Sequence, residues 1–114
     1  MDAISASLMI KALDGLSARA LATAQNIANA GTPNYRPLRA SFEDALREAA
    51  AKGPEAIGQV RPKIEHVQPS AVAPDMRLDL ELATASSTAL RYSALIEILN
   101  RQTQIQALAF SGNN

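Results

Sequence analysis

The sequence predicts a mainly α-helical chain, in which two long terminal helices pack as a coiled-coil-like pair and are joined by a short helix and a Pro-rich loop or small β-ribbon. Apolar residues recur at spacings of three and four near both ends of the 114-residue chain. Four of the six prolines lie between those ends, within residues 54–78. Only 4% of the residues are aromatic although 47% are apolar, a composition that suits slim helices packed side by side.

The predicted organisation has three segments in one domain, because a chain of this length supports only a modest core. Residues 1–36 contain the N-terminal helix and an Asn/Thr-Pro signature. Residues 37–78 contain the short helix and the loop or ribbon linker. Residues 79–114 form the C-terminal helix.

The N-terminal helix is expected over residues 1–30, with Asp2 and Ser5 as candidate caps near its start. Its apolar seam consists of Met9, Leu13, Leu16, Ala20, Thr23 and Ile27. Gly15 lies inside this pattern at a cost of about 1 kcal/mol relative to alanine. It therefore either weakens the helix or marks a tight contact.

The end of this helix is expected at Gly31, which is predicted to adopt the left-handed conformation of a C-terminal cap. Pro33 cannot continue a helix and starts a turn with Asn34. Asn26 and Asn29 are poor residues in a helix interior. Near its end, we expect their amides to bond free carbonyls or a partner helix.

The middle of the chain is expected to start with a short helix, since residues 41–44 resemble a capping box with Asp44 in the glutamate position. Its predicted apolar face consists of Phe42, Ala45, Leu46 and Ala49, and Lys52-Gly53-Pro54 ends it. Beyond it, residues 60–67 alternate imperfectly, so a loop is favoured over a strand. His66 is the single histidine and is expected to be a surface or packing residue.

The C-terminal helix is expected to run for about 30 residues from Asp79 as its N-cap, after a brief extended lead-in over residues 76–82. One apolar edge consists of Leu82, Ala85, Ala89, Tyr92, Ile96 and Leu99. A second edge consists of Leu95, Ile98, Ile105 and Leu108. One partner helix cannot bury both edges, so we expect the N-terminal helix to cover one and other subunits to cover the rest.

The string Asn-Ile-Ala-Asn-Ala-Gly-Thr-Pro-Asn-Tyr-Arg at residues 26–36 resembles the N-terminal signature of the flagellar rod/hook family of axial proteins. Members of that family usually read Asn-x-Ala-Asn-x-x-Thr-Pro-Gly-Tyr/Phe-Lys/Arg. Asn34 departs from the usual glycine, but asparagine is the next most tolerant residue for left-handed geometry. Residues 89–95, Ala-Leu-Arg-Tyr-Ser-Ala-Leu, resemble the C-terminal helix of the proximal rod members, which share the short middle segment. Residues 100–114, which follow this motif, are more polar than the resemblance leads us to expect.

The resemblance implies a structural subunit of the proximal rod of the flagellar basal body that polymerises through its terminal helices into a drive shaft. It implies a periplasmic location after export without a cleavable signal peptide. The partners it implies are further copies of the chain, other flagellar rod proteins and the export-gate base of the basal body. The residues that carry the motif or the expected assembly edges are Asn26, Ala28, Asn29, Gly31, Thr32, Pro33, Tyr35, Leu90, Tyr92, Leu95, Ile98 and Ile105.

Composition argues against several other classes of function. Lysine and arginine total 11, as do aspartate and glutamate, so no electrostatic case for nucleic acid exists. No apolar run reaches the roughly 20 residues of a membrane span, so no membrane insertion is expected. Without cysteine or a catalytic or metal-ligating motif, we expect no enzyme, no cofactor and no metal. Asp44 and Glu48 lie four residues apart on one face of a predicted helix, where we expect both side chains to be exposed to solvent. The alternative is a non-polymerising helical module, either a coiled-coil adaptor or a secretion-linked chaperone, which would form small closed oligomers.

Overall fold

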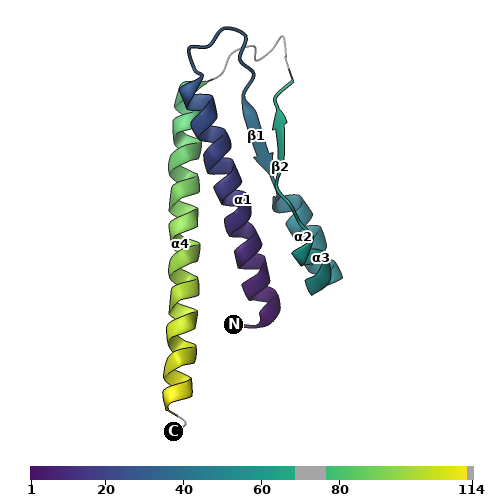
Figure 1. The fold of residues 1–114 in the computed structure, drawn as a ribbon, viewed down its shortest axis with the longest axis vertical. Helices are drawn as coiled ribbons and strands as arrows, with labels where there is room; N and C mark the ends of the chain where they lie inside the picture. The colour runs from purple at the N-terminus through teal and green to yellow at the C-terminus, as the bar shows by residue number, and fades with distance from the viewer. Residues whose placement is uncertain (69–76, 113–114) are drawn as a thin grey trace.

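The computed structural model describes residues 1–68 and 77–112 and confirms the predicted fold class. Its elements are α1 (Ala3–Ala28), β1 (Leu38–Ser41), α2 (Glu43–Lys52), α3 (Pro54–Gly58), β2 (Lys63–His66) and α4 (Leu78–Ser111). Helices α1 and α4 run side by side in opposite directions, while the ribbon and the short helices lie along the other side of α1 (Figure 1). Helix α1 is therefore the central element, and it contacts α2, α3, α4 and β1.

Helix α1 begins as predicted but ends by a different device. The carboxylate of Asp2 caps it, since Oδ1 accepts the backbone N–H of Ser5 at 2.7 Å. Ser5 itself lies inside the helix. The expectation of a left-handed Gly31 was wrong: among the described residues, positive φ occurs at Asn34 (62°) and at Gly53 (119°). The chain leaves α1 through consecutive turns closed by the N–H groups of Thr32 and Tyr35, so no left-handed cap is needed.

The middle segment forms a two-stranded antiparallel ribbon, in which Leu38 lies opposite His66 and Ser41 opposite Lys63. The preference for a loop over residues 60–67 was therefore wrong, because β2 pairs with a distant strand rather than folding on itself. The exposed His66 ring also bonds the carbonyl oxygen of Arg36, 2.9 Å from Nδ1. The predicted capping box was wrong as well: Ser41 belongs to β1, and the N-cap of α2 is Phe42, which makes no side-chain cap bond. Of the predicted α2 face, Ala45 is exposed.

Helix α4 extends for 34 residues, close to the expected length. Its N-cap is Arg77 rather than Asp79, which lies in the first turn and pairs with Arg77 at 2.8 Å. The expected extended lead-in was wrong for Leu78 and Leu80, both of which are helical, while residue 76 lies outside the described residues. The least exposed residues of α4 are Glu81, Ala85, Thr88, Leu95, Leu99 and Gln102.

This pattern corrects the predicted seam of α4. Leu82, Ala89, Tyr92 and Ile96 are exposed, and the polar Glu81 and Thr88 are buried on the neighbouring stripe instead. Leu95, assigned to the second edge, is half-buried. The helix is thus rotated from the orientation that its apolar residues predict, because Glu81 is bound within the fold.

The molecule is elongated, with extents of 64 × 28 × 17 Å. Its radius of gyration is 17.9 Å, whereas a compact chain of this length would have about 13 Å. It exposes 7972 Å², against about 6,000 Å² for a compact protein of this mass. Among the described residues, the hydrophobic core comprises only Leu16, Ala22, Ala40, Phe42, Ala49 and Ile57. Within residues 1–68 and 77–112, no helix combines the length and the apolar character that a bilayer span requires.

Candidate assembly site

The side chain of Asn26 connects four parts of the fold. It is fully buried, and its Nδ2 donates to the carbonyl oxygen of Leu38 at 2.9 Å and to Oε2 of Glu81 at 3.0 Å. Its Oδ1 accepts the N–H of Leu38 at 2.8 Å and the hydroxyl of Tyr35 at 2.9 Å. These four bonds use the full capacity of the amide. Asn26 therefore ties α1 to the junction, to β1 and to α4, as a structural role for this residue requires.

The backbone of β1 facing α1 is satisfied by side chains rather than by a third strand. The N–H of Val67 donates to the carbonyl oxygen of Pro37, so Pro37 faces β2. Because backbone groups alternate in direction along an antiparallel ladder, the N–H and C=O groups of Leu38 and Ala40 point away from β2, towards α1. Asn26 binds both backbone groups of Leu38, and Nη2 of Arg19 donates to the carbonyl oxygen of Ala40 at 3.0 Å. Two polar side chains of α1 thus fix the ribbon against the helix by binding three of the backbone groups that β1 turns towards it.

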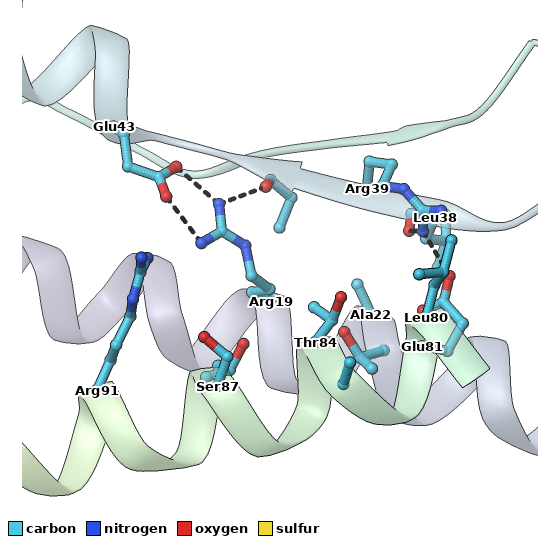
Figure 2. A pocket seen from close by; sticks show the side chains of 14 residues that line it. Arg19, Ala22, Leu38, Arg39, Glu43, Leu80, Glu81, Thr84, Ser87 and Arg91 are labelled. Carbon is cyan, nitrogen blue, oxygen red and sulfur yellow. Dashed lines mark hydrogen bonds and ion pairs between the residues drawn. The ribbon is translucent and has the colours of Figure 1, made fainter. Parts of the chain in front are cut away.

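Glu81 is the α4 side chain held in this network. It is 2% exposed, and its Oε1 accepts from Nη1 of Arg39 at 2.7 Å while Oε2 accepts from Asn26. The Arg39 side chain is itself 57% exposed. Figure 2 shows Arg39 reaching from β1 to Glu81 at the start of α4. The apolar spacing in the sequence did not predict Glu81 as part of the site; its place four residues before Ala85 and seven before Thr88, on one face of the helix, is the signal that could have found it.

Gly15, Arg19 and Phe42 form a second anchor between α1 and α2. Arg19 binds the carboxylate of Glu43 with both Nη atoms, at 2.8 and 2.6 Å, and its Cζ lies 4.8 Å from the centroid of the Phe42 ring. This ion pair lowers the pKa of Glu43. A Cβ atom at Gly15 would overlap the Phe42 ring, well inside 3.0 Å. Of the two expectations for Gly15, the structure supports the tight contact.

The remaining signature residues shape the end of α1. Nδ2 of Asn29 donates to the carbonyl oxygen of Gln25 at 2.8 Å, and the hydroxyl of Thr32 donates to Oδ1 of Asn29 at 3.1 Å. Asn26 therefore makes the expected bond to a partner helix, through Glu81, whereas the Gln25 carbonyl that Asn29 bonds is not free, because it also accepts the backbone N–H of Asn29. Asn34 adopts the left-handed conformation at the position where the family signature has glycine. The other motif residues, Ala28, Gly31, Thr32 and Pro33, are exposed.

The far end of α4 continues past α1 without a partner among the residues that the structure describes. The amino group of Met1 donates to Oε1 of Gln102 at 3.1 Å, so the start of α1 is level with that residue. Residues 103–111, which we call the overhang, extend further (Figure 1). Within the overhang, Ile105, Leu108 and Phe110 are 56%, 71% and 82% exposed. Of the other assembly residues expected on α4, Leu90, Tyr92 and Ile98 are also exposed.

An apolar groove of about 610 Å³ lies where α1, α2 and α4 meet; we call it the three-helix groove. Its apolar lining comprises Leu8, Met9, Ala12, Leu16, Phe42, Leu46, Ala50, Ala94 and Leu95. Arg47 and Arg91 lie among its charged lining residues. The groove thus presents an apolar surface beside α1 that is open to another chain.

A second pocket of about 590 Å³, between α1, β1 and α4, is lined by charged and hydroxyl side chains together with apolar ones (Figure 2). Its two carboxylates, Glu43 and Glu81, are both bound by arginines. Within the described ranges, no group of histidine, cysteine or acidic residues could hold a metal ion. The chemistry that this pocket offers is therefore hydrogen bonding and ion pairing.

A scan against protein-family models and a search of curated proteins found no match to this chain.

Proposed function

We propose that the protein is a structural subunit of the proximal rod of the bacterial flagellar basal body, of the FlgB type. In this proposal it polymerises through its terminal helices into a torque-transmitting drive shaft. The observation that carries the proposal is the Asn-x-Ala-Asn-x-x-Thr-Pro-x-Tyr-Arg string of residues 26–36, placed at the end of a long N-terminal helix that pairs with the C-terminal one. Asn26, Asn29, Thr32 and Tyr35 from this string are all used in hydrogen bonds at the junction.

The exposed apolar surface supports an assembling protein. Large apolar side chains are exposed along α4 from Leu78 to Phe110. Extended apolar surface on a soluble chain is characteristic of an interaction site. Neighbouring subunits that cover this surface would gain about 25 cal/mol for each Å² of apolar area removed from water.

The overhang and the three-helix groove have similar lengths. Nine helical residues, 103–111, span about 13 Å, and the groove floor from Leu8 to Leu16 follows α1 for about 12 Å. A helical segment laid in the groove beside α1, α2 and α4 would complete a four-helix arrangement. When the segment comes from a neighbouring copy with the same orientation, each contact leaves another overhang and another groove open, so the assembly continues.

The proposal places the protein in the periplasmic rod after export without a cleavable signal peptide. Its partners are further copies of the chain, other flagellar rod proteins and the export-gate base of the basal body.

Deletion of the gene in its native bacterium tests the proposal. We expect non-swimming cells whose isolated basal bodies lack the rod, and restoration of both by the wild-type gene. A double substitution of the overhang, Leu108→Ser with Phe110→Ser, should fail to restore swimming although the chain is stable and folded. Gln106→Ser, a polar change in the same segment, is the matched control and should restore swimming. Normal rods in the deletion strain would refute the proposal.

The oligomeric state of the purified chain separates the proposal from an adaptor or chaperone. A rod subunit should associate progressively as its concentration rises, because head-to-tail contacts do not close. Light scattering coupled to gel filtration that shows a fixed dimer or tetramer over a hundredfold range of concentration would favour the adaptor.

A further inference from the structure

The surface between α1 and α4 consists mainly of small or polar side chains. The cleft between the two helices is lined on α1 by Leu16, Ser17, Ala20, Ala24 and Ile27, and on α4 by Ala85, Thr88, Ala89, Tyr92 and Ser93. Small residues allow close approach of two helices, but they provide few large knobs that fit a single set of holes. Apolar packing alone therefore specifies the axial position of α4 weakly.

A slip of α4 by seven residues would change this packing little. We call the six least exposed residues of α4 the α4 stripe: Glu81, Ala85, Thr88, Leu95, Leu99 and Gln102. In the observed register, three of these residues are apolar, namely Ala85, Leu95 and Leu99. After a slip of seven residues, their places would be taken by Thr88, Tyr92, Leu95, Gln102, Gln106 and Ala109, of which three are again apolar. The slip requires about 10 Å, and the twelve peptide steps from His66 to Leu78 can span up to about 40 Å. Chain length therefore does not prevent it.

We infer that Glu81 fixes the register of α4 on α1. Among the described residues, α4 side chains bond other elements at two places: at Glu81, and at the exposed terminal pair of Met1 and Gln102. The buried carboxylate of Glu81 is bound from α1 and from β1 at once. After a seven-residue slip, Thr88 would take its place, and a single hydroxyl cannot replace a carboxylate that pairs with Arg39 and Asn26 together. Breaking both bonds of a buried carboxylate is costly, so the observed register dominates.

The register has a consequence for the exposed surface. A seven-residue slip would bring residue 109 level with Met1, so Ile105 and Leu108 would lie beside α1 and the overhang would shrink to two residues. Glu81 therefore sets how much of α4 is presented beyond α1. This inference concerns a single chain, and it stands or falls independently of the proposed rod function.

Disulfide mapping in the full chain tests the inference, because the sequence contains no cysteine. Along the antiparallel pair, Ser17 lies about 13 Å from Asn26 and Ala89 about 12 Å from Glu81 in the same direction. In the observed register, a chain with Ser17→Cys and Ala89→Cys should therefore form a disulfide. After a seven-residue slip Ile96 would take the place of Ala89, so a chain with Ser17→Cys and Ile96→Cys should form a disulfide only in the slipped register. Oxidation at low protein concentration keeps the crosslinks within one chain, and mass spectrometry counts them.

With Glu81 present, we expect the observed-register crosslink to exceed the slipped one by about tenfold or more. Glu81→Ala should bring the two close to parity. Glu81→Gln should preserve part of the preference, because its amide oxygen can still accept from Asn26 while its NH2 group cannot accept from Arg39. Glu97→Ala, which removes an exposed carboxylate from the same helix, is the control and should change nothing.

An unchanged crosslink ratio in Glu81→Ala would overturn the inference, as would the lack of any preference in the parent chain. If Glu81→Ala forms neither crosslink, Arg39→Ala decides the matter, since it removes one of the two bonds to Glu81 without altering α4. A ratio lowered severalfold in Arg39→Ala supports the register role, and an unchanged ratio refutes it.

Discussion

Replacing Gly15 by alanine sets two physical effects against each other. In a helix interior, alanine is favoured over glycine by about 1 kcal/mol, so the substitution should stabilise α1 if the site is open. The structure indicates the opposite, because the added Cβ would fall inside 3.0 Å of Cγ, Cδ1 and Cδ2 of Phe42. The Phe42 ring is buried and lies below the Arg19 guanidinium, so it has little room to move. Overpacking of a core costs about 1–3 kcal/mol. We therefore expect Gly15→Ala to lower the free energy of unfolding by about 1 kcal/mol.

Urea denaturation followed by circular dichroism measures this change. Ser17→Ala, at an exposed position two residues later in α1, is the matched control and should show only the small gain from helix propensity. Adding Phe42→Leu to Gly15→Ala should recover part of the loss, since the smaller side chain makes room for the methyl group. A Gly15→Ala chain about 1 kcal/mol more stable than wild type would show that Phe42 does not pack against this position.

Three further predictions concern the junction and the anchor. Asn34→Val should destabilise the chain by about 1–2 kcal/mol in thermal melts because its φ is 62°, whereas Gly31→Ala, with open space around it, should be neutral; equal effects would refute this assignment of the left-handed residue. Asn26→Ala should cost several kcal/mol, since it removes one of the two bonds to the buried Glu81 and both bonds to the backbone of Leu38; wild-type stability in urea would contradict the central network. Arg19 lowers the pKa of Glu43 below its ordinary value of about 4.5, so this pair stabilises the fold above that pH and its contribution is lost as the pH falls through the lowered pKa. The stability difference between wild type and Arg19→Met should therefore shrink below pH 4.5, and a difference that is constant from pH 7 to pH 3 would argue against the ion pair.

Local signals in the sequence predicted the parts of the fold that depend on local chemistry. Asp2 caps α1 because a carboxylate before a helix has unpaired N–H groups within reach. Asn34 adopts positive φ because asparagine tolerates it, and the turn after Pro33 needs it. The amides of Asn26 and Asn29 bond near a helix end, where backbone carbonyls and neighbouring segments lie close.

Long-range contacts produced the differences. β2 is a strand only because residues 38–41 lie beside it, and no pattern within residues 60–67 contains that partner. Glu81 is buried because Asn26 and Arg39, both distant in sequence, supply its hydrogen bonds. The spacing of apolar residues alone predicts that a glutamate on α4 faces solvent. The same burial rotates α4 and exposes Leu82 and Ile96. Gly31 was assigned a left-handed conformation from its residue type, but a series of turns ends the helix instead.

A cryo-EM reconstruction of basal bodies purified from the native bacterium tests the rod assignment most directly. We expect density in the proximal rod that fits the antiparallel pair of α1 and α4, with Asn26 between the junction, β1 and Glu81. We also expect Ile105, Leu108 and Phe110 of each copy to be covered by a neighbouring subunit. A rod whose density is fully explained by other chains, with this protein absent from the particles, would contradict it.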